Sequence, residues 1–194
     1  NDRPFIATEF IEGETLREHM TGALMSVREA LEVGIQVASA LSVAHKAGII
    51  HRDIKPENIM IRHDDVVKIL DFGLAKLALD PSATPDTEAT TMAKRTETEP
   101  GTLMGTVAYM SPEQARGLKV DGRTDIFSLG VVLYEMIAGK PPFESPTKMD
   151  TLAAILNREP DLLAQHTPEA PPELEQIISR SLRKDPDERY QTIG

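Results

Sequence analysis

The pattern of apolar positions predicts a fully buried helix beyond the middle of the chain. Between Asp125 and Ala138, apolar side chains occur on nearly every side, and the run ends at Gly139, shortly before a pair of prolines. A helix that is apolar all round has no face to turn to water, so other elements must cover it. We therefore expect a central buried helix over about residues 124–138.

Amphipathic patterns predict helices on both sides of this segment. Ser26 with Glu29 is a capping box, which opens a helix whose apolar residues recur at three- and four-residue spacing toward Gly48. A glycine commonly follows the end of a helix, because it adopts the left-handed conformation without strain. Similar signals predict a short helix opened by Thr15 and Glu18, and further helices near residues 147–157 and 172–183.

Short segments of other character complete the pattern. The opening run, residues 4–11, is apolar and β-prone until Gly13 breaks it. Residues 59–61 and 66–70 flank a polar turn sequence, so they predict two strands of a hairpin. Residues 79–101 have no hydrophobic period and are dominated by Ser, Thr, Pro, Asp and Glu. We expect them to form a mobile loop.

Composition limits the classes of function. A chain of 194 residues can bury one sizeable core. Its formal net charge of -10 argues against nucleic acid or an anionic membrane as the main partner, because both attract basic surfaces. Without cysteine there is no disulfide, thiolate ligand or cysteine nucleophile. No apolar run approaches the roughly eighteen residues of a transmembrane helix. The chain begins without Met or a signal-peptide pattern, so we expect it to be a piece of a longer protein.

Two motifs carry chemistry suited to phosphoryl transfer. They are residues 51–58, with the sequence HRDIKPEN, and residues 71–73, with the sequence DFG. A hydroxyl that attacks a nucleoside triphosphate needs an acceptor for its proton, a cation on the transferred phosphate, and oxygen ligands for Mg²⁺. The residues that match these needs, in that order, are Asp53, Lys55, and the pair Asn58 and Asp71.

With these motifs and the run GTVAYMSPEQARG at residues 105–117, the chain resembles the bacterial Ser/Thr protein kinases of the eukaryotic-like type. The resemblance implies an α+β protein-kinase-like fold, present here as the mostly helical C-terminal lobe with a short β-hairpin and an incomplete N-terminal lobe. Residues 1–12 would be the last N-lobe strand and the hinge, residues 13–194 the C-lobe, and residues 71–113 the activation segment. The family's Gly-rich loop, strand lysine and helix glutamate do not occur in this sequence.

The same resemblance implies transfer of the ATP γ-phosphoryl group, with Mg²⁺ or Mn²⁺, to Ser or Thr hydroxyls of proteins. Asp53 would orient the hydroxyl and Lys55 would neutralise the γ-phosphate. Lys55 and Thr106 favour Ser/Thr over Tyr acceptors. For Ile11 and Met60, ordinary core packing is an equal alternative. The implied cofactor-binding residues are Glu9, Ile11, Lys55, Glu57, Asn58, Met60 and Asp71, of which Asn58 and Asp71 hold the metal.

Further residues have regulatory or structural roles by resemblance. Arg52 and Lys76 would bind a phosphate on the loop between them, with Thr98 and Thr102 as preferred acceptors, and this would order Thr106 against the catalytic aspartate. The residues with implied structural roles are Glu113 and Arg189, as a buried ion pair, and Asp125, as an acceptor of backbone N–H groups from the 51–58 loop.

Two other functions stay open. The chain could be a non-catalytic kinase-lobe binding or scaffold module, or a kinase-like small-molecule phosphotransferase, although the second class is not expected to carry the 105–117 run. We expect the 194 residues alone to be inactive, because half of the ATP cleft is missing. The expected partners are protein substrates and, for trans-autophosphorylation, a kinase dimer, with no nucleic acid and no membrane contact in this segment. The expected location is cytoplasmic, and a membrane anchor outside this segment stays open.

Overall fold

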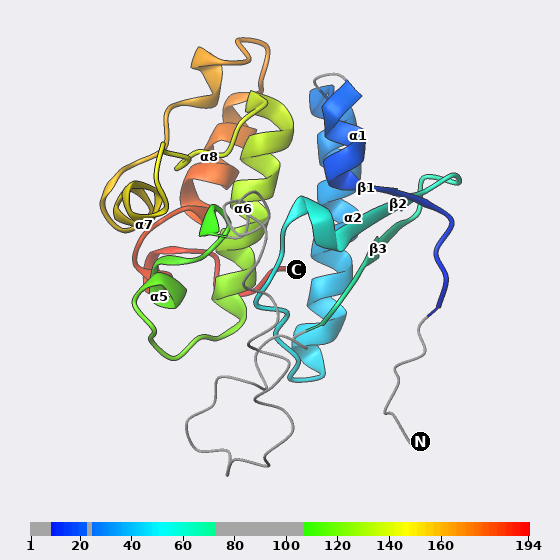
Figure 1. Ribbon diagram of the computed structural model, residues 1–194, viewed down its shortest axis with the longest axis horizontal. Coiled ribbons are helices and arrows are strands. Elements are labelled where there is room, and N and C mark those ends of the chain that lie inside the picture. The colour runs from blue at the N-terminus through cyan, green and yellow to red at the C-terminus, as the bar shows by residue number, and fades with distance from the viewer. Residues whose placement is uncertain (1–8, 23–24, 73–106) are drawn as a thin grey trace.

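The fold consists of helices packed around one central helix, with a small sheet at one side (Figure 1). The computed structural model describes residues 9–22, 25–72 and 107–194. Its α-helices are α1 (Leu16–Gly22), α2 (Val27–Lys46), α5 (Pro112–Ala115), α6 (Gly122–Ala138), α7 (Lys148–Asn157) and α8 (Pro172–Ser181). Its strands are β1 (Gly13–Thr15), β2 (Ile59–Arg62) and β3 (Val67–Ile69), and its short 3₁₀ helices are η1 (Pro56–Asn58), η3 (Leu163–Gln165) and η4 (Pro186–Glu188).

Helix α6 is the predicted central helix. It packs against α2 on one side and α8 on another, and Phe127, Val131 and Val132 are completely buried in the core. The helix begins at Gly122, with Asp121 as its N-cap, and ends at Ala138, followed by the C-cap Gly139 with a left-handed φ of 76°. The prediction of a buried central helix is therefore confirmed, and its start lies slightly earlier than expected.

The two predicted caps of the N-terminal helices form to different extents. At α1, Thr15 Oγ1 accepts from the Glu18 N–H at 3.1 Å, and the Glu18 carboxylate accepts from the Thr15 N–H at 2.8 Å. At α2, Ser26 Oγ accepts from the Glu29 N–H at 3.2 Å, but the Glu29 carboxylate binds His19 instead, with 2.7 Å between Oε1 and Nε2. Helix α2 therefore starts where predicted, but only the hydrogen bond to the Ser26 side chain forms, and the Glu29 carboxylate does not complete the capping box.

The sheet contains the predicted hairpin and one strand that was not predicted. Strands β2 and β3 pair antiparallel, and β1 pairs antiparallel with the other edge of β2. We expected Gly13 only to break an earlier strand, and that interpretation was wrong, because Gly13 is the first residue of β1 and lies opposite Arg62. A Cβ atom at Gly13 would lie 2.2 Å from the Ile61 carbonyl oxygen, so this close approach requires glycine.

The remaining predicted elements lie in the C-terminal half or outside the described residues. Helix α7 matches its prediction, and α8 ends at Ser181, slightly before the expected residue 183. In the expected opening strand, residues 9–11 are not in a strand and residues 4–8 lie outside the described residues, as does the predicted loop at 79–101. Among the helices of the described residues, none combines the length and apolar character that a membrane crossing requires.

Candidate active site

The backbone of the 51–58 loop is held by a buried carboxylate at the start of α6. Asp125, fully buried, accepts from the His51 N–H at 2.9 Å and from the Arg52 N–H at 2.7 Å through its two oxygens. Its Oδ2 also lies 2.7 Å from His45 Nε2, on α2. These contacts hold Arg52 at a φ of 70°, a left-handed conformation that is uncommon for a residue other than glycine. The structure thus gives Asp125 the contacts that the resemblance implied.

The imidazole of His51 joins this loop to the strand that leads to Asp71. Its Nδ1 accepts from the Asp53 N–H at 3.3 Å, and its Nε2 lies 2.7 Å from the Leu70 carbonyl oxygen. Because Nδ1 accepts, Nε2 must carry the proton and donate to Leu70. The ring also packs edge-on against Phe72, with 4.8 Å between centroids. His51 therefore fixes the spacing between the two motifs.

The predicted proton acceptor lies in contact with two donors of the same loop. Lys55 Nζ donates to Asp53 Oδ2 at 2.8 Å, and Asn58 Nδ2 donates to the same oxygen at 2.9 Å. The side chains of Lys55 and Asp53 are 16% and 33% exposed, so both remain accessible at the surface of the loop. With Oδ2 engaged twice, Oδ1 is the oxygen of Asp53 left for an incoming hydroxyl.

The chemistry of the donor set near Asn58 and Asp71 fits a magnesium ion shared with a phosphate. The Leu70 N–H donates to the Asn58 carbonyl at 2.8 Å, which places Asn58 beside the residue preceding Asp71. Asp71 is exposed and has a left-handed φ of 54°. Within the described residues, no group of three or more His, Cys, Asp or Glu could hold a metal alone. One carboxylate and one amide oxygen suit Mg²⁺ when phosphates and water complete its coordination.

The residues predicted to surround a nucleotide lie in η1, in β2 and in the segment before β1. Met60, half-buried, lies in β2 opposite Lys68, whose Nζ lies 3.7 Å from Glu9 Oε2. Ile11 is half-buried. Glu57 directs its carboxylate to Arg17 on α1, with 2.8 Å between Oε1 and Nε. None of these contacts tests a role in cofactor binding, which stays a prediction for all four of the residues Glu9, Ile11, Glu57 and Met60.

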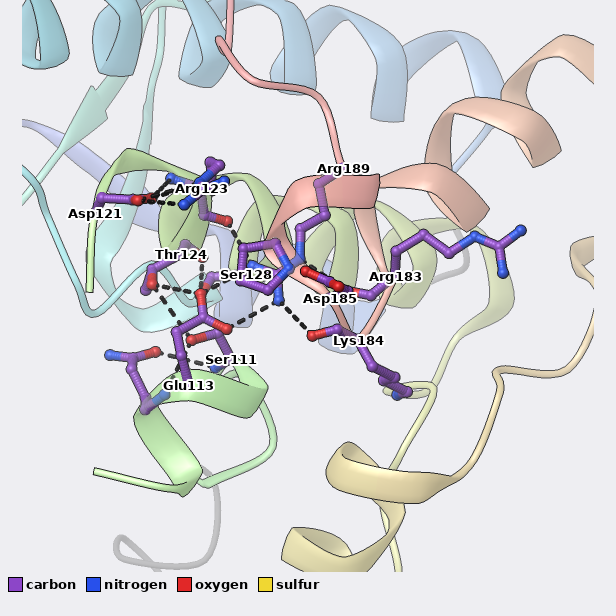
Figure 2. Close-up of polar contacts among 12 residues, drawn as sticks. Ser111, Glu113, Asp121, Arg123, Thr124, Ser128, Arg183, Lys184, Asp185 and Arg189 are labelled. Atoms are coloured by element: carbon purple, nitrogen blue, oxygen red, sulfur yellow. Dashed lines mark hydrogen bonds and ion pairs between the residues drawn. The ribbon is translucent and has the colours of Figure 1, made fainter. Parts of the chain in front are cut away.

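Glu113 and Arg189 form a bidentate ion pair (Figure 2). Each Arg189 Nη atom lies 2.9 Å from one oxygen of Glu113, and Thr124 donates to Glu113 Oε1 at 2.7 Å. Burial alone would raise the pKa of Glu113, but the hydrogen bonds from Arg189 and Thr124 outweigh it, so the pKa is lowered. The fully buried Arg189 also donates to backbone carbonyls of residues 123, 183 and 184, so the pair joins α5, α6 and the C-terminal segment.

Most of the predicted regulatory residues lie outside the described residues. These are Lys76, Thr98, Thr102 and Thr106. Arg52 is described, and its carbonyl accepts from Gln114 Nε2 at 2.7 Å. Its guanidinium Nε is buried and has no hydrogen-bond partner among the described residues.

Three residues that hold the site together were not predicted from the sequence, namely His45, Gln114 and Arg17. His45 falls in the three- and four-residue pattern of apolar positions in its helix, which gives no sign of a polar contact. Gln114 had a signal, because Ser111 and Gln114 have the spacing of a capping box, and both halves of that box form. Arg17 had no signal in the sequence, because its partners lie 40, 92 and 118 residues away.

Comparisons with known proteins find similar sequences among protein kinases. A family model described as a protein kinase domain matches residues 1–193. The serine/threonine-protein kinase PknB of Mycolicibacterium smegmatis is 38% identical over 98% of the chain and 29% of that protein. A probable serine/threonine-protein kinase of Streptomyces coelicolor is 37% identical over 97% of the chain and 26% of that protein. One of Clostridium perfringens is 39% identical over 99% of the chain and 26% of that protein. The chain thus spans less than a third of the length of these relatives.

Proposed function

Since the chain belongs to the protein kinase domain family, we propose that the whole protein transfers the γ-phosphoryl group of ATP to Ser or Thr hydroxyls of protein substrates. The observation that carries the proposal is that Lys55 and Asn58 both donate hydrogen bonds to the same carboxylate oxygen of Asp53. The similar proteins are named as serine/threonine-protein kinases, which supports the choice of acceptor. The proposal retains protein substrates as partners, with trans-autophosphorylation in a kinase dimer, and a cytoplasmic location.

In this mechanism, Asp53 Oδ1 accepts the hydrogen bond of the substrate hydroxyl and orients it for attack. Asn58 and Lys55 hold the carboxylate in place, and Lys55 also offers its positive charge to the transferred phosphate. Asn58 Oδ1 and the Asp71 carboxylate would hold the metal ion. When bound, Mg²⁺ would neutralise charge on the phosphates.

The proposal also assigns the parts of the chain. Residues 1–12 would be the last strand of the small lobe and the hinge, where Glu9 and Ile11 contact the adenine. Residues 13–194 would be the large lobe, with Met60 and Glu57 at the nucleotide, and residues 71–113 the activation segment. We expect the 194 residues alone not to turn over ATP, because a Gly-rich loop and strand lysine do not occur in them and lost positioning costs many orders of magnitude in rate.

A phosphate on Thr98 or Thr102 would activate the enzyme by binding Arg52 and Lys76 and ordering Thr106 near Asp53. The support within the described residues is the Arg52 guanidinium, whose buried Nε has no partner there. A phosphate carries up to two negative charges and pairs well with guanidinium donors. Mass spectrometry of the autophosphorylated protein, with Thr98→Ala and Thr102→Ala variants, tests this part.

The experiment that tests the function compares the whole protein with its Asp53→Asn variant. Turnover of a Thr-containing peptide should fall by about 10²–10⁴-fold, because the proton acceptor is lost, while ATP affinity should stay nearly the same. Asp64→Asn, in the exposed turn between β2 and β3, is the matched control and should leave both quantities unchanged. Turnover of Asp53→Asn within tenfold of the wild type would refute the assignment.

A further inference from the structure

Arg17 on α1 connects three segments of the molecule that are distant in the sequence. Its Nε lies 2.8 Å from Glu57 Oε1, and its Nη1 lies 2.7 Å from Glu135 Oε1 on α6. Its Nη2 contacts the hydroxyl of Tyr109, which in turn donates to Glu135 Oε2 at 2.5 Å. One guanidinium therefore serves two carboxylates, one from the 51–58 loop and one from the central helix.

This cluster carries an excess of negative charge. The side chain of Glu135 is 5% exposed, whereas those of Arg17 and Glu57 are 34% and 42% exposed. Burial lowers the pKa of Arg17, but the hydrogen bonds that Arg17 donates to Glu135 and Glu57 outweigh it and the pKa is raised, so Arg17 stays charged. Among the described residues, Arg17 is the one cation within ion-pair distance of either carboxylate. Two carboxylates and one guanidinium leave a net charge of about -1.

The cluster lies beside the place where a peptide substrate must bind. Glu57 is next to Asn58 in the loop that carries Asp53, and Tyr109 lies within the 105–117 run, which by the resemblance shapes the ledge that binds the substrate peptide. On its other side the cluster adjoins a cavity of about 110 Å³. The cavity is lined in part by Arg17, Glu135, Met20, Met25 and Met136.

We propose that Arg17 determines substrate specificity by occupying, from within the protein, a two-carboxylate site that would otherwise bind a basic side chain of the substrate. The site has the right chemistry for a guanidinium, because it already holds one through charge-assisted hydrogen bonds to two separate carboxylates. With Arg17 in place, a second cation would meet a site that is already filled. The kinase therefore gains less from an arginine near the acceptor residue than it would if both carboxylates were free. This inference rests on the proposed function for its substrate, but the Arg17 site itself can be tested without turnover.

The rival explanation is that Arg17 is only a structural brace between α1, α6 and the 51–58 loop. A brace accounts for a loss of stability when Arg17 is removed, and for an equal loss of activity with every peptide. It does not account for a change in the preference between charged and neutral peptides. The charge preference therefore separates the two explanations.

The kinetic test uses the whole protein with Arg17→Ala and a set of Thr peptides. The peptides carry either arginine or its neutral isostere citrulline at each of the three positions on either side of the acceptor. For each position we take the ratio of kcat/KM for the arginine peptide to that for the citrulline peptide. At one position this ratio should be about tenfold or more higher in Arg17→Ala than in the wild type, since close charge pairs couple at least this strongly. Using a ratio removes any overall change in turnover. Arg28→Ala is the matched control, because among the described residues Arg28 pairs only with Glu32, on the exposed face of α2.

The second test needs no activity. Ethylguanidinium at millimolar concentration should raise the Tm of Arg17→Ala by about 2 °C or more relative to its effect on the wild type, because it refills the vacated site. The double variant Arg17→Ala/Glu135→Gln should lose this gain. If Arg17→Ala does not fold, Arg17→Lys takes its place in both tests, with a smaller effect, because an ammonium cannot bridge both carboxylates.

The outcomes are distinct. A wild type that phosphorylates no peptide refutes the proposed function, and the ethylguanidinium measurement then decides on Arg17 alone. An active enzyme whose arginine-to-citrulline ratio is unchanged by Arg17→Ala refutes the specificity role. An absent Tm gain shows that the two carboxylates do not form a guanidinium site, and this also refutes the proposal.

Discussion

The carboxamide of Asn58 donates twice to Asp53, to its carbonyl oxygen at 2.8 Å and to its carboxylate at 2.9 Å. Both amide hydrogens are used within one turn of the loop, so the orientation of the carboxamide is fixed. The oxygen Oδ1 is the atom left to bind a metal ion. Asn58 thus couples the orientation of the proposed base to the position of the proposed metal ligand.

This coupling predicts a strong effect of Asn58→Asp. The change removes both donors and places a second carboxylate against Asp53, so the two groups repel each other and the base loses its orientation. Turnover of the whole protein should fall by about 10²-fold or more. Asn157→Asp, at the exposed end of α7, is the matched control and should have no effect. Steady-state kinetics with a Thr peptide checks this, and equal turnover in both variants would contradict the coupling.

Asp71→Ala should remove the Mg²⁺ dependence of ATP binding. In the proposed site Asp71 is the one carboxylate that binds the metal, and water replaces such a ligand poorly next to phosphates. We expect the affinity for Mg²⁺-ATP to fall by about 10–100-fold or more. It should approach the affinity of the wild type for ATP after a chelator has removed Mg²⁺. Calorimetric titration of the whole protein with and without Mg²⁺ measures this. Asp64→Ala, in an exposed turn, should retain the wild-type difference.

Breaking the Glu113–Arg189 pair should destabilise the kinase domain by about 3–5 kcal/mol, because Arg189→Met leaves a buried carboxylate without its partner. Adding Glu113→Gln should recover part of this loss. Arg62→Met, which removes an exposed pair with Asp64, should cost about 0–1 kcal/mol. Denaturant unfolding measures all three variants, and a loss below about 1 kcal/mol for Arg189→Met would contradict the role.

The same pair makes a prediction about pH. The pKa of Glu113 is lowered in the folded protein, so its stabilising contribution is complete above the ordinary value of 4.5 and is lost as the pH falls through the lower folded value. Stability of the wild type should therefore fall more steeply below about pH 4.5 than that of Glu113→Gln. Parallel curves for the two proteins in this range would contradict the contribution.

The elements that could be predicted from the sequence are those set by local chemistry. Helix α6 is apolar on every side over a length that only a helix explains, and its end is marked by Gly139. The caps at Thr15 and Ser26 are contacts between residues three apart, so the sequence itself contains both partners. The 51–58 loop was predicted through its resemblance, because its conformation depends on Asp125, far away in the chain.

The features that could not be predicted depend on contacts between distant segments. Strand β1 has only three residues, and it is a strand because β2 lies beside it and Gly13 allows the close approach. Arg17 looks like an ordinary surface residue of an amphipathic helix until Glu57, Tyr109 and Glu135 are brought to it. Local propensity contains no information on either pairing.

Lys184 should make stability increase with pH in the alkaline range. Its ammonium is largely buried and lies 3.7 Å from the centre of the Phe143 ring, and its Nζ has no hydrogen-bond partner among the described residues. Burial lowers its pKa from 10.5 to about 8, although the ring face favours the charged form. Between these two values the unfolded chain binds more protons than the folded chain, so the free energy of unfolding rises with pH through this window.

Replacing Lys184 by Met tests this argument, because Met keeps the length of the side chain and removes the charge. The stability of Lys184→Met, measured by denaturant unfolding between pH 7 and 10, should exceed that of the wild type at the acid end, and the difference should shrink toward the alkaline end. Lys119→Met changes an exposed lysine and should follow the wild-type curve at every pH. A constant difference between Lys184→Met and the wild type across this range would show that Lys184 remains charged and that its contact with Phe143 outweighs its burial.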